Sequence, residues 1–161
     1  MLDTPWSLRA TPQQLSSLAR ACAELARYER RAIRALAGLA ARREIVFRDL
    51  IERFEADAWS RHRDIVEALE RTNDLLGRET TRDEPSLGPL GDTEVVMAEL
   101  LVEGLGRYDE ALSVERAPWS LRQCWSRARR QHRRMIDALA ARHRMMTGQR
   151  LPTLMAPAVA E

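Results

Sequence analysis

The fold is decided by residues 12–41, PQQLSSLARACAELARYERRAIRALAGLAA, in which one set of residues recurs every three or four positions. That spacing places the set on one face of a single long helix. Its members are Leu15, Leu18, Cys22, Leu25, Glu29, Ala32, Leu36 and Leu39. Glu29 is the one carboxylate among apolar or small residues, and burying a carboxylate without a partner is costly. We therefore expect Glu29 to belong to a polar site inside the protein.

The composition favours helices and one ordinary domain. The chain has 161 residues, of which 45% are hydrophobic and 31% are charged. It contains no lysine, so all 26 basic residues are arginines, and arginine, alanine, leucine and glutamate are good helix formers. The net charge of only +2 argues against a general attraction to nucleic acid. Two cysteines in a helical protein suit a reducing compartment. The sequence has no apolar run long enough to suggest a membrane span or a secretion signal, so we expect a cytoplasmic protein.

Capping and breaking residues divide the chain into four predicted helices. Thr11, Pro12 and Gln14 form a helix start with a capping-box pattern, and Gly77 is a natural C-cap. Residues 78–91 are polar and rich in proline and glycine, which predicts a long loop. The predicted bundle covers residues 11–147, with helices at 12–41, 45–76, 93–114 and 118–146, a lead at 1–10 and a flexible tail at 148–161. One continuous helix through the first two segments is the alternative.

Each later helix has an apolar stripe that a polar residue interrupts. On the second helix the stripe is Phe47, Ile51, Phe54, Ala58, His62, Ile65, Leu69 and Leu76. On the third it is Val95, Ala98, Val102, Leu105, Asp109 and Leu112, and on the fourth Leu121, Trp125, Ala128, His132, Met135, Leu139 and Met146. The stripes predict an all-α antiparallel four-helix bundle with an internal polar layer around Glu29, His62, Asp109 and His132.

Two sequence matches indicate that the bundle consists of two repeated helical hairpins. Residues 25–29, LARYE, match residues 105–109, LGRYD. Residues 62–69, HRDIVEAL, match residues 132–139, HRRMIDAL. The matches occur in the same order in both halves, which favours a duplicated hairpin over chance similarity between arginine-rich helices. The long loop would then connect the two halves as a crossover.

Two hairpins, a crossover and inward-facing carboxylates and histidines resemble the ferritin-like superfamily, particularly its small bacterial bundle proteins without an assigned activity. Metal-bearing members hold two metal ions with a Glu from each of two helices and a Glu-x-x-His from each of the others. By this resemblance, the candidate metal ligands are Glu29, His62, Asp109 and His132, with Glu24 and Glu103 as alternative carboxylates. Trp59 and Arg129 stand where the Glu of each Glu-x-x-His would be.

The same polar residues allow a purely structural interpretation. The pairs Tyr28–Glu29 and Tyr108–Asp109 could bond an arginine or histidine across the bundle and fix the register of the helices. Because half of the ligand motif is replaced and no other catalytic motif is present, we expect a non-enzymatic interaction or regulatory module. Its partner would be another protein or a second copy of the chain, and we expect no membrane partner and no resident cofactor.

Two alternatives remain. The first is a divergent ferritin-like protein that binds iron or another divalent metal, with a di-iron centre as its fullest form. The second and weaker one is nucleic-acid binding through the arginine-rich fourth helix. The third helix is correspondingly acidic, which favours charge pairing between neighbouring helices over binding of phosphates.

Overall fold

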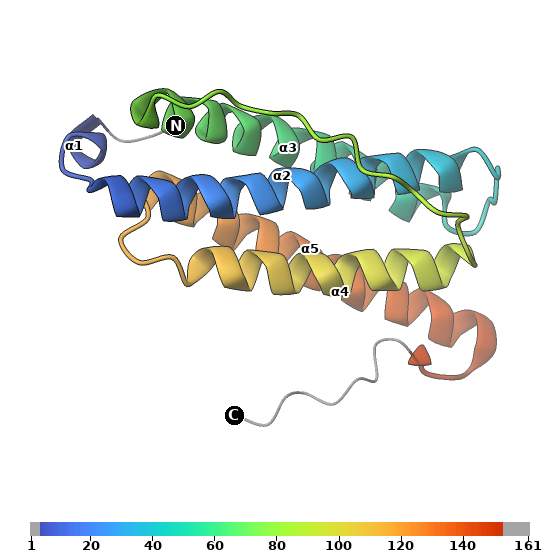
Figure 1. The fold of residues 1–161 in the computed structure, drawn as a ribbon. Helices are drawn as coiled ribbons and strands as arrows, with labels where there is room; N and C mark the ends of the chain where they lie inside the picture. The colour runs from blue at the N-terminus through green and yellow to red at the C-terminus, as the bar shows by residue number, and fades with distance from the viewer. Residues whose placement is uncertain (1–3, 153–161) are drawn as a thin grey trace.

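The computed structural model describes residues 4–152, which form five helices and contain no strand. The helices are α1 (Thr4–Ser7), α2 (Pro12–Ala40), α3 (Arg48–Leu76), α4 (Thr93–Leu112) and α5 (Trp119–Thr147). The four long helices form two antiparallel hairpins, α2–α3 and α4–α5, which pack on each other mainly through α2 and α4 (Figure 1). The predicted all-α four-helix bundle of two hairpins is therefore confirmed.

Residues 41–47 form a turn between α2 and α3, so the alternative of one continuous helix is wrong. Arg43 has a φ of 55° in this turn, a left-handed conformation that no helix interior contains. The turn is longer than predicted, and α3 begins at Arg48 instead of residue 45. The longer turn changes which residues of α2 and α3 lie side by side, and this determines the partner of Glu29.

The helix starts and ends follow local chemistry. The Thr11 hydroxyl accepts from the backbone N–H of Gln14 at 3.2 Å, and the Gln14 side chain accepts from the N–H of Thr11 at 2.9 Å. This reciprocal pair is the predicted capping box. Gly77 ends α3 with a φ of 65°, a conformation that glycine adopts without steric cost.

The core lies between the inner faces of the four long helices. Every residue of the stripe predicted for α2 is buried, and so is the stripe of α5 from Leu121 to Leu139. Met146, which was predicted to continue the α5 stripe, is 53% exposed. The hairpins thus bury the faces that the three-to-four-residue spacing indicates, except at the end of α5, on α4, and at His62 and Leu76 of α3, which are only partly buried.

The stripe predicted for α4 was mostly wrong, because Ala98 is its one fully buried member. The buried residues of α4 are Thr93, Met97, Ala98, Leu100, Leu101, Gly104, Tyr108 and Ala111. Val95, Val102 and Asp109, which the prediction placed inside, are exposed. Apolar residues occur around most of the circumference of α4, so the sequence offers more than one apolar face and does not select between them.

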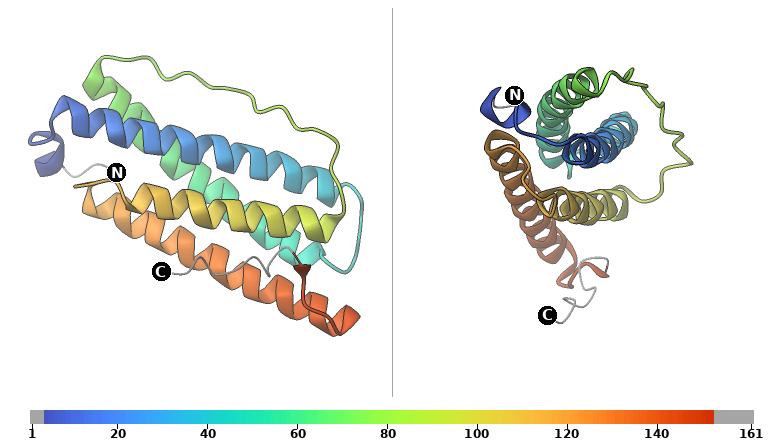
Figure 2. Two further views of the ribbon diagram at one scale, coloured as in Figure 1. Left: turned by 60° about the horizontal axis from the view of Figure 1, so that its bottom comes forward. Right: turned by 60° about the vertical axis from the view of Figure 1, so that its left-hand side comes forward.

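Residues 77–92 form a crossover that runs the length of the bundle and joins the far ends of the two hairpins (Figure 2). Two arginines of α2 and one of the turn that follows it hold the crossover by donating to its backbone carbonyls. The bonds join Arg30 to Asp83, Arg34 to Pro85, and Arg42 to Leu90 and Gly91, at N···O distances of 2.5 to 2.7 Å. Gly38 lies on the same side of α2, where a Cβ atom would stand 2.6 Å from Cδ1 of Leu90.

The two ends of the described chain also pack on the bundle, since Leu151 is buried in the core and Trp6 packs against it. Within the predicted lead, α1 places Trp6 so that its indole N–H donates to the carbonyl of Arg116, in the turn between α4 and α5. The tail predicted from residue 148 lies mostly outside the described residues. Over residues 4–152, no helix combines the length and the apolar character needed to cross a membrane.

Candidate functional site

A buried layer of polar side chains crosses the bundle. Its members are Tyr28, Glu29, Arg61, Tyr108 and His132, none of which is more than 9% exposed. We call these five residues the buried layer. They come from all four long helices, because α2 supplies the first two and α3, α4 and α5 supply one each.

Glu29 is fully engaged by two of its neighbours. Arg61 donates from Nε to Oε1 at 2.6 Å and from Nη2 to Oε2 at 3.2 Å, and the Tyr108 hydroxyl donates to Oε1 at 2.5 Å. Burial raises the pKa of the Glu29 carboxyl, and the charge of Arg61 opposes that rise. Burial would lower the pKa of Arg61, but Glu29 holds it above its ordinary value. Bidentate charged pairs of this kind are among the strongest hydrogen bonds in proteins.

His132 is held at both ring nitrogens. Nδ1 lies 2.8 Å from the carbonyl oxygen of Ala128, which can only accept, so Nδ1 carries the hydrogen and Nε2 is an acceptor. The Tyr28 hydroxyl lies 2.9 Å from that Nε2 and 2.8 Å from the carbonyl oxygen of Leu100, so one hydrogen serves two acceptors. Burial, with Arg61 nearby, lowers the pKa of His132 to about 3. The imidazole is therefore neutral near pH 7.

Gly104 allows α4 to approach this histidine closely. A Cβ atom at position 104 would stand 2.1 Å from the Tyr28 hydroxyl oxygen and 2.4 Å from Nε2 of His132. No heavy atoms approach each other so closely without a bond, so any larger residue would displace the Tyr28–His132 contact. The glycine is thus part of the geometry of the buried layer.

The structure brings together only two of the four residues predicted to form the polar layer. Glu29 and His132 belong to the buried layer, whereas His62 and Asp109 do not, and their predicted placement inside was wrong. His62 is half-buried at the outer side of α3. Asp109 is exposed and forms an ion pair with Arg129.

The alternative carboxylates also lie away from the layer. Glu24 pairs with Arg27 at 3.3 Å, and Glu103 pairs with Arg31, in each case on the partly exposed outer surface. The prediction missed Arg61, although residue 61 follows Ala58 by three positions and therefore fits the α3 stripe as well as residue 62 does. The structural interpretation holds for the pair Tyr28–Glu29, because Glu29 bonds Arg61 and Tyr28 bonds His132 across the bundle. It does not hold for the second pair, since Tyr108 bonds Glu29 while Asp109 stays outside.

The buried layer does not fit the metal centre that the ferritin-like resemblance implies. Both oxygens of Glu29 accept from Arg61, and both nitrogens of His132 have hydrogen-bond partners in the protein. A fixed guanidinium also repels a cation from this position. In the part of the chain that the structure describes, no group of three or more His, Cys, Asp or Glu is placed to hold a metal ion.

The arginine-rich α5 is partly neutralised within the bundle. Arg129 pairs with Asp109 of α4, and Arg142 makes a two-point contact with Asp49 of α3 at 2.9 and 3.1 Å. His143 lies 2.6 Å from the carboxylate of Glu94 on α4. These pairs agree with charge pairing between neighbouring helices and give no particular support to a phosphate-binding face.

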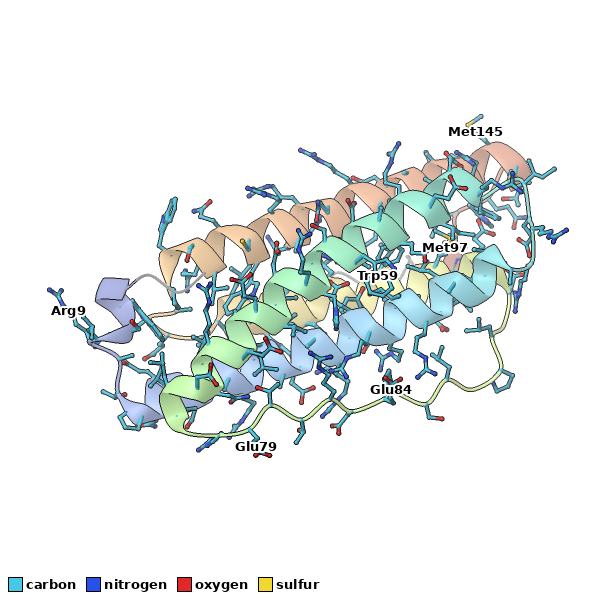
Figure 3. All side chains as sticks on the ribbon, turned by 90° about the horizontal axis from the view of Figure 1, so that it is seen from above. Arg9, Trp59, Glu79, Glu84, Met97 and Met145 are labelled. Atoms are coloured by element: carbon cyan, nitrogen blue, oxygen red, sulfur yellow. The ribbon has the colours of Figure 1, made fainter. Side chains whose placement is uncertain are left out.

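A large pocket lies on the other side of the bundle, between α2, α3 and the first half of the crossover. We call it the strap pocket, and its volume is about 1030 Å³. It is lined by Arg30, Ile33, Arg34, Ala56, Trp59, Ser60, His62, Arg63, Val66, Glu67, Leu69, Glu70, Thr80, Thr81, Arg82 and Glu84. Figure 3 shows Trp59 on α3 and Glu84 on the crossover, which runs beside α2.

The strap pocket combines an apolar surface with polar groups that have no partner. Most of its surface is apolar, and Trp59, which is 56% exposed, contributes to it. Among the described residues, the buried Nε of Arg30 and Nε2 of His62 have no hydrogen-bond partner. Burial lowers the pKa of His62, and the charges of Arg30 and Arg82 lower it further. Such a pocket with a few convergent polar groups is the usual form of a small-molecule site.

Searches with this chain found no matching family model, no matching curated protein and no matching solved structure. The functional argument therefore depends on the buried layer and the strap pocket alone. They differ in one respect that matters for function. The polar groups of the buried layer bond to one another, whereas Nε of Arg30 and Nε2 of His62, in residues that line the strap pocket, are buried without a hydrogen-bond partner in the described part of the chain.

Proposed function

We propose that the protein is a non-enzymatic binding or regulatory module of ferritin-like shape. In this proposal the buried layer fixes the packing of the two hairpins, and the strap pocket is the binding surface. The observation that carries the proposal is that Glu29 and His132, the groups best suited to acid–base or metal chemistry, already have hydrogen-bond partners within the protein.

The strap pocket supports the binding half of the proposal. Its volume of about 1030 Å³ is at the upper end of the range for small-molecule sites. It forms between two helices of one hairpin and a crossover that arginines of α2 hold in place. The pocket thus has a base in α2 and α3 and a wall in the anchored crossover.

A pair of tryptophan substitutions tests the proposal. Ala56 is an exposed residue of α3 that lines the strap pocket, and Ala141 is an exposed residue of α5 that does not. We expect compounds from a library of mixed charge to raise the melting temperature of the wild type and of Ala141→Trp, but not of Ala56→Trp. The proposal would be contradicted if no compound raised the melting temperature of the wild type, or if the compounds raised it equally in Ala56→Trp and Ala141→Trp.

The proposal also requires that the buried layer hold no metal. Protein purified from growth with added iron and zinc should contain far less than one metal ion per chain by elemental analysis. Near-stoichiometric metal that disappears in His132→Ala but persists in His143→Ala would overturn the proposal, because it would place a metal at the buried layer.

A further inference from the structure

The two halves of the crossover cover the bundle in different ways, and the strap pocket lies under the first half. Residues 85–90, PSLGPL, carry Leu87 and Leu90, which pack against the core. Residues 78–84, RETTRDE, have only polar side chains, and four of them line the pocket. The first half therefore spans a space that no apolar side chain of its own fills.

The base of this space is apolar. Trp59 and Val66 of α3 lie seven positions apart and thus on the same side of the helix, and Ala56 lies one turn before Trp59. Ile33 of α2 and Leu69 of α3 complete the base, and both are buried against the core. An apolar base under a polar cover offers its contact area to an apolar molecule.

Every arginine and glutamate that lines the pocket has a partner within the protein. The side-chain pairs are Arg34–Glu84 at 3.0 Å, Arg82–Glu70 at 3.4 Å, Arg63–Asp64 at 3.5 Å and Arg71–Glu67 at 2.6 Å. Arg30 donates to the carbonyl of Asp83 at 2.5 Å. A charged ligand would meet no unpaired counter-ion here, so removing its charge from water would be costly.

The two polar atoms without partners do not change this balance. Nε of Arg30 and Nε2 of His62 are fully buried and therefore lie out of reach of a ligand in the pocket. Burial and the charges of Arg30 and Arg82 lower the pKa of His62, so its imidazole is neutral near pH 7. The pocket thus offers a ligand an apolar base and charges that are already paired.

Trp59 indicates the shape of the ligand. Its ring is perpendicular to that of His62, with the ring centroids 6.3 Å apart. Despite this contact the Trp59 side chain is 56% exposed. Aromatic rings pack on one another in offset-stacked or edge-to-face pairs, which contribute more than the buried area alone. A flat aromatic molecule therefore gains more from this tryptophan than a saturated molecule of the same size.

We propose that the strap pocket binds an uncharged molecule with a flat aromatic body, which lies against Trp59 and the apolar base and fills the space under residues 80–84. This inference rests on the proposed binding function and adds the class of the ligand. The ligand supplies to the first half of the crossover the apolar packing that Leu87 and Leu90 supply to the second half.

Four probes built on one two-ring skeleton test the ligand class by calorimetry on the full chain at pH 7. They are 2-naphthol, its saturated analogue decahydro-2-naphthol, the anion 2-naphthoate and the cation 2-naphthylmethylammonium. We expect 2-naphthol to bind about tenfold or more tightly than either ion, because the charge of an ion would lose its water without gaining a partner. It should bind about three- to tenfold more tightly than the saturated alcohol.

Two outcomes of this comparison would overturn the assignment. Binding of either ion that equals or exceeds that of 2-naphthol would show that the pocket is not selective for uncharged molecules. Binding of decahydro-2-naphthol that equals or exceeds that of 2-naphthol would show that it is not selective for aromatic ones.

A matched pair of tryptophan variants locates the ligand. Trp59→Ala should weaken 2-naphthol binding by about tenfold, because it removes the aromatic surface of the pocket. Trp119→Ala removes a tryptophan that is 71% exposed and lies outside the pocket, so it should bind as the wild type does. Both side chains are exposed, so both variants should fold. Equal 2-naphthol binding by Trp59→Ala and the wild type would contradict this placement.

NMR on the wild type gives a direct readout of the contact. The indole N–H signal of Trp59, identified by its absence in Trp59→Ala, should shift when 2-naphthol binds, and that of Trp119 should not. Binding without a shift of the Trp59 signal would overturn the inference.

The failure of this inference differs from the failure of the proposed function. If none of the four probes binds, but a library compound of another class binds the wild type and not Ala56→Trp, only the ligand class is contradicted. If neither the probes nor any library compound binds the wild type, the binding function of the pocket is contradicted as well.

Discussion

The two hairpins contain the same Tyr–acid pair and use it differently. Tyr28 of α2 and Tyr108 of α4 are both buried. Glu29, which follows the first tyrosine, lies inside with Arg61, whereas Asp109, which follows the second, lies outside with Arg129. Two buried carboxylates in one layer would repel each other, and one guanidinium could not neutralise both. The hairpins therefore contribute unequal parts to a single layer.

For the histidines it is the second hairpin that supplies the buried copy. His132 of α5 is buried in the layer, and His62 of α3 faces the strap pocket. The preceding residues, Arg61 and Gln131, bond to each other at 3.2 Å across the bundle. The difference teaches that both tyrosines are buried, whereas only one copy of the acid and one copy of the histidine enter the buried layer and the other copy lies outside it. The following experiments test this division, from the largest expected effect to the smallest.

The two arginine–carboxylate pairs should differ most. Arg61→Ala leaves Glu29 buried without its partner, so we expect the free energy of unfolding to fall by about 3–5 kcal/mol. Arg129→Ala, which breaks the equivalent pair at the surface, should lower it by about 1 kcal/mol or less. Urea unfolding followed by circular dichroism measures both. Similar losses of the free energy of unfolding in the two variants would show that the buried and the exposed pair stabilise the fold equally.

The two histidines should differ in how they affect acid stability. His132 has a folded pKa of about 3 against an ordinary value of 6.5, so below pH 6.5 the unfolded chain takes up a proton that the folded chain does not. The stability contributed by neutral His132 is complete above pH 6.5 and is lost toward pH 3, by at most about 1.4 kcal/mol per pH unit.

Urea unfolding from pH 7.5 to 4 checks this pH dependence in variants of each histidine. His132→Gln should remove much of the slope below pH 6.5, and His62→Gln should remove less, because His62 is only half-buried. Carboxylates contribute to the slope in all three proteins, so the informative quantity is the difference from the wild type. An unchanged slope in His132→Gln would contradict the assignment of a neutral buried imidazole.

The two buried tyrosines should differ by a smaller amount. Tyr108 donates to a charged carboxylate, and Tyr108→Phe should lower the free energy of unfolding by about 1.5–3 kcal/mol. Tyr28 donates to neutral acceptors, and Tyr28→Phe should cost about 0.5–1.5 kcal/mol. Thermal or urea unfolding measures both, and a larger loss in Tyr28→Phe would reverse the order proposed here.

Two glycines of α4 test the close approach of the hairpins. Gly104→Ala places a methyl group against Tyr28 and His132 and should lower the free energy of unfolding by about 1–3 kcal/mol. Gly106→Ala meets no atom within 4 Å and should raise it by about 0.5–1 kcal/mol through helix propensity. A stabilising Gly104→Ala in a melting experiment would show that α4 does not pack so closely.

The sequence predicted the fold better than the orientation of individual side chains. The capping box at Thr11 and the C-cap at Gly77 depend on neighbours a few residues away, so local sequence suffices. The face of α4 does not follow from local sequence, because its apolar residues extend around the helix. Contacts with α2 and α5 are what place Gly104 and Tyr108 inside.

The candidate site was predicted in part for the same reason. Glu29 and His132 lie on clear stripes and were identified, whereas Arg61 and His62 fit the α3 stripe equally well. The choice between them depends on the length of the turn at residues 41–47, because this length sets which residue of α3 lies beside Glu29. The strap pocket could not be predicted, because the path of the crossover depends on contacts between residues about fifty positions apart.

The attachment of the crossover through its carbonyl oxygens has a consequence for how the sequence of this protein can evolve. Every residue has a carbonyl, so these bonds require the side chains of Arg30 and Arg34 on α2 and of Arg42 in the turn after it, but no particular side chain at the residues whose carbonyls accept. Substitutions in residues 80–91 can therefore accumulate while the backbone stays anchored. Related chains could in this way acquire new ligand preferences along one wall of the pocket without rebuilding the helices beneath it.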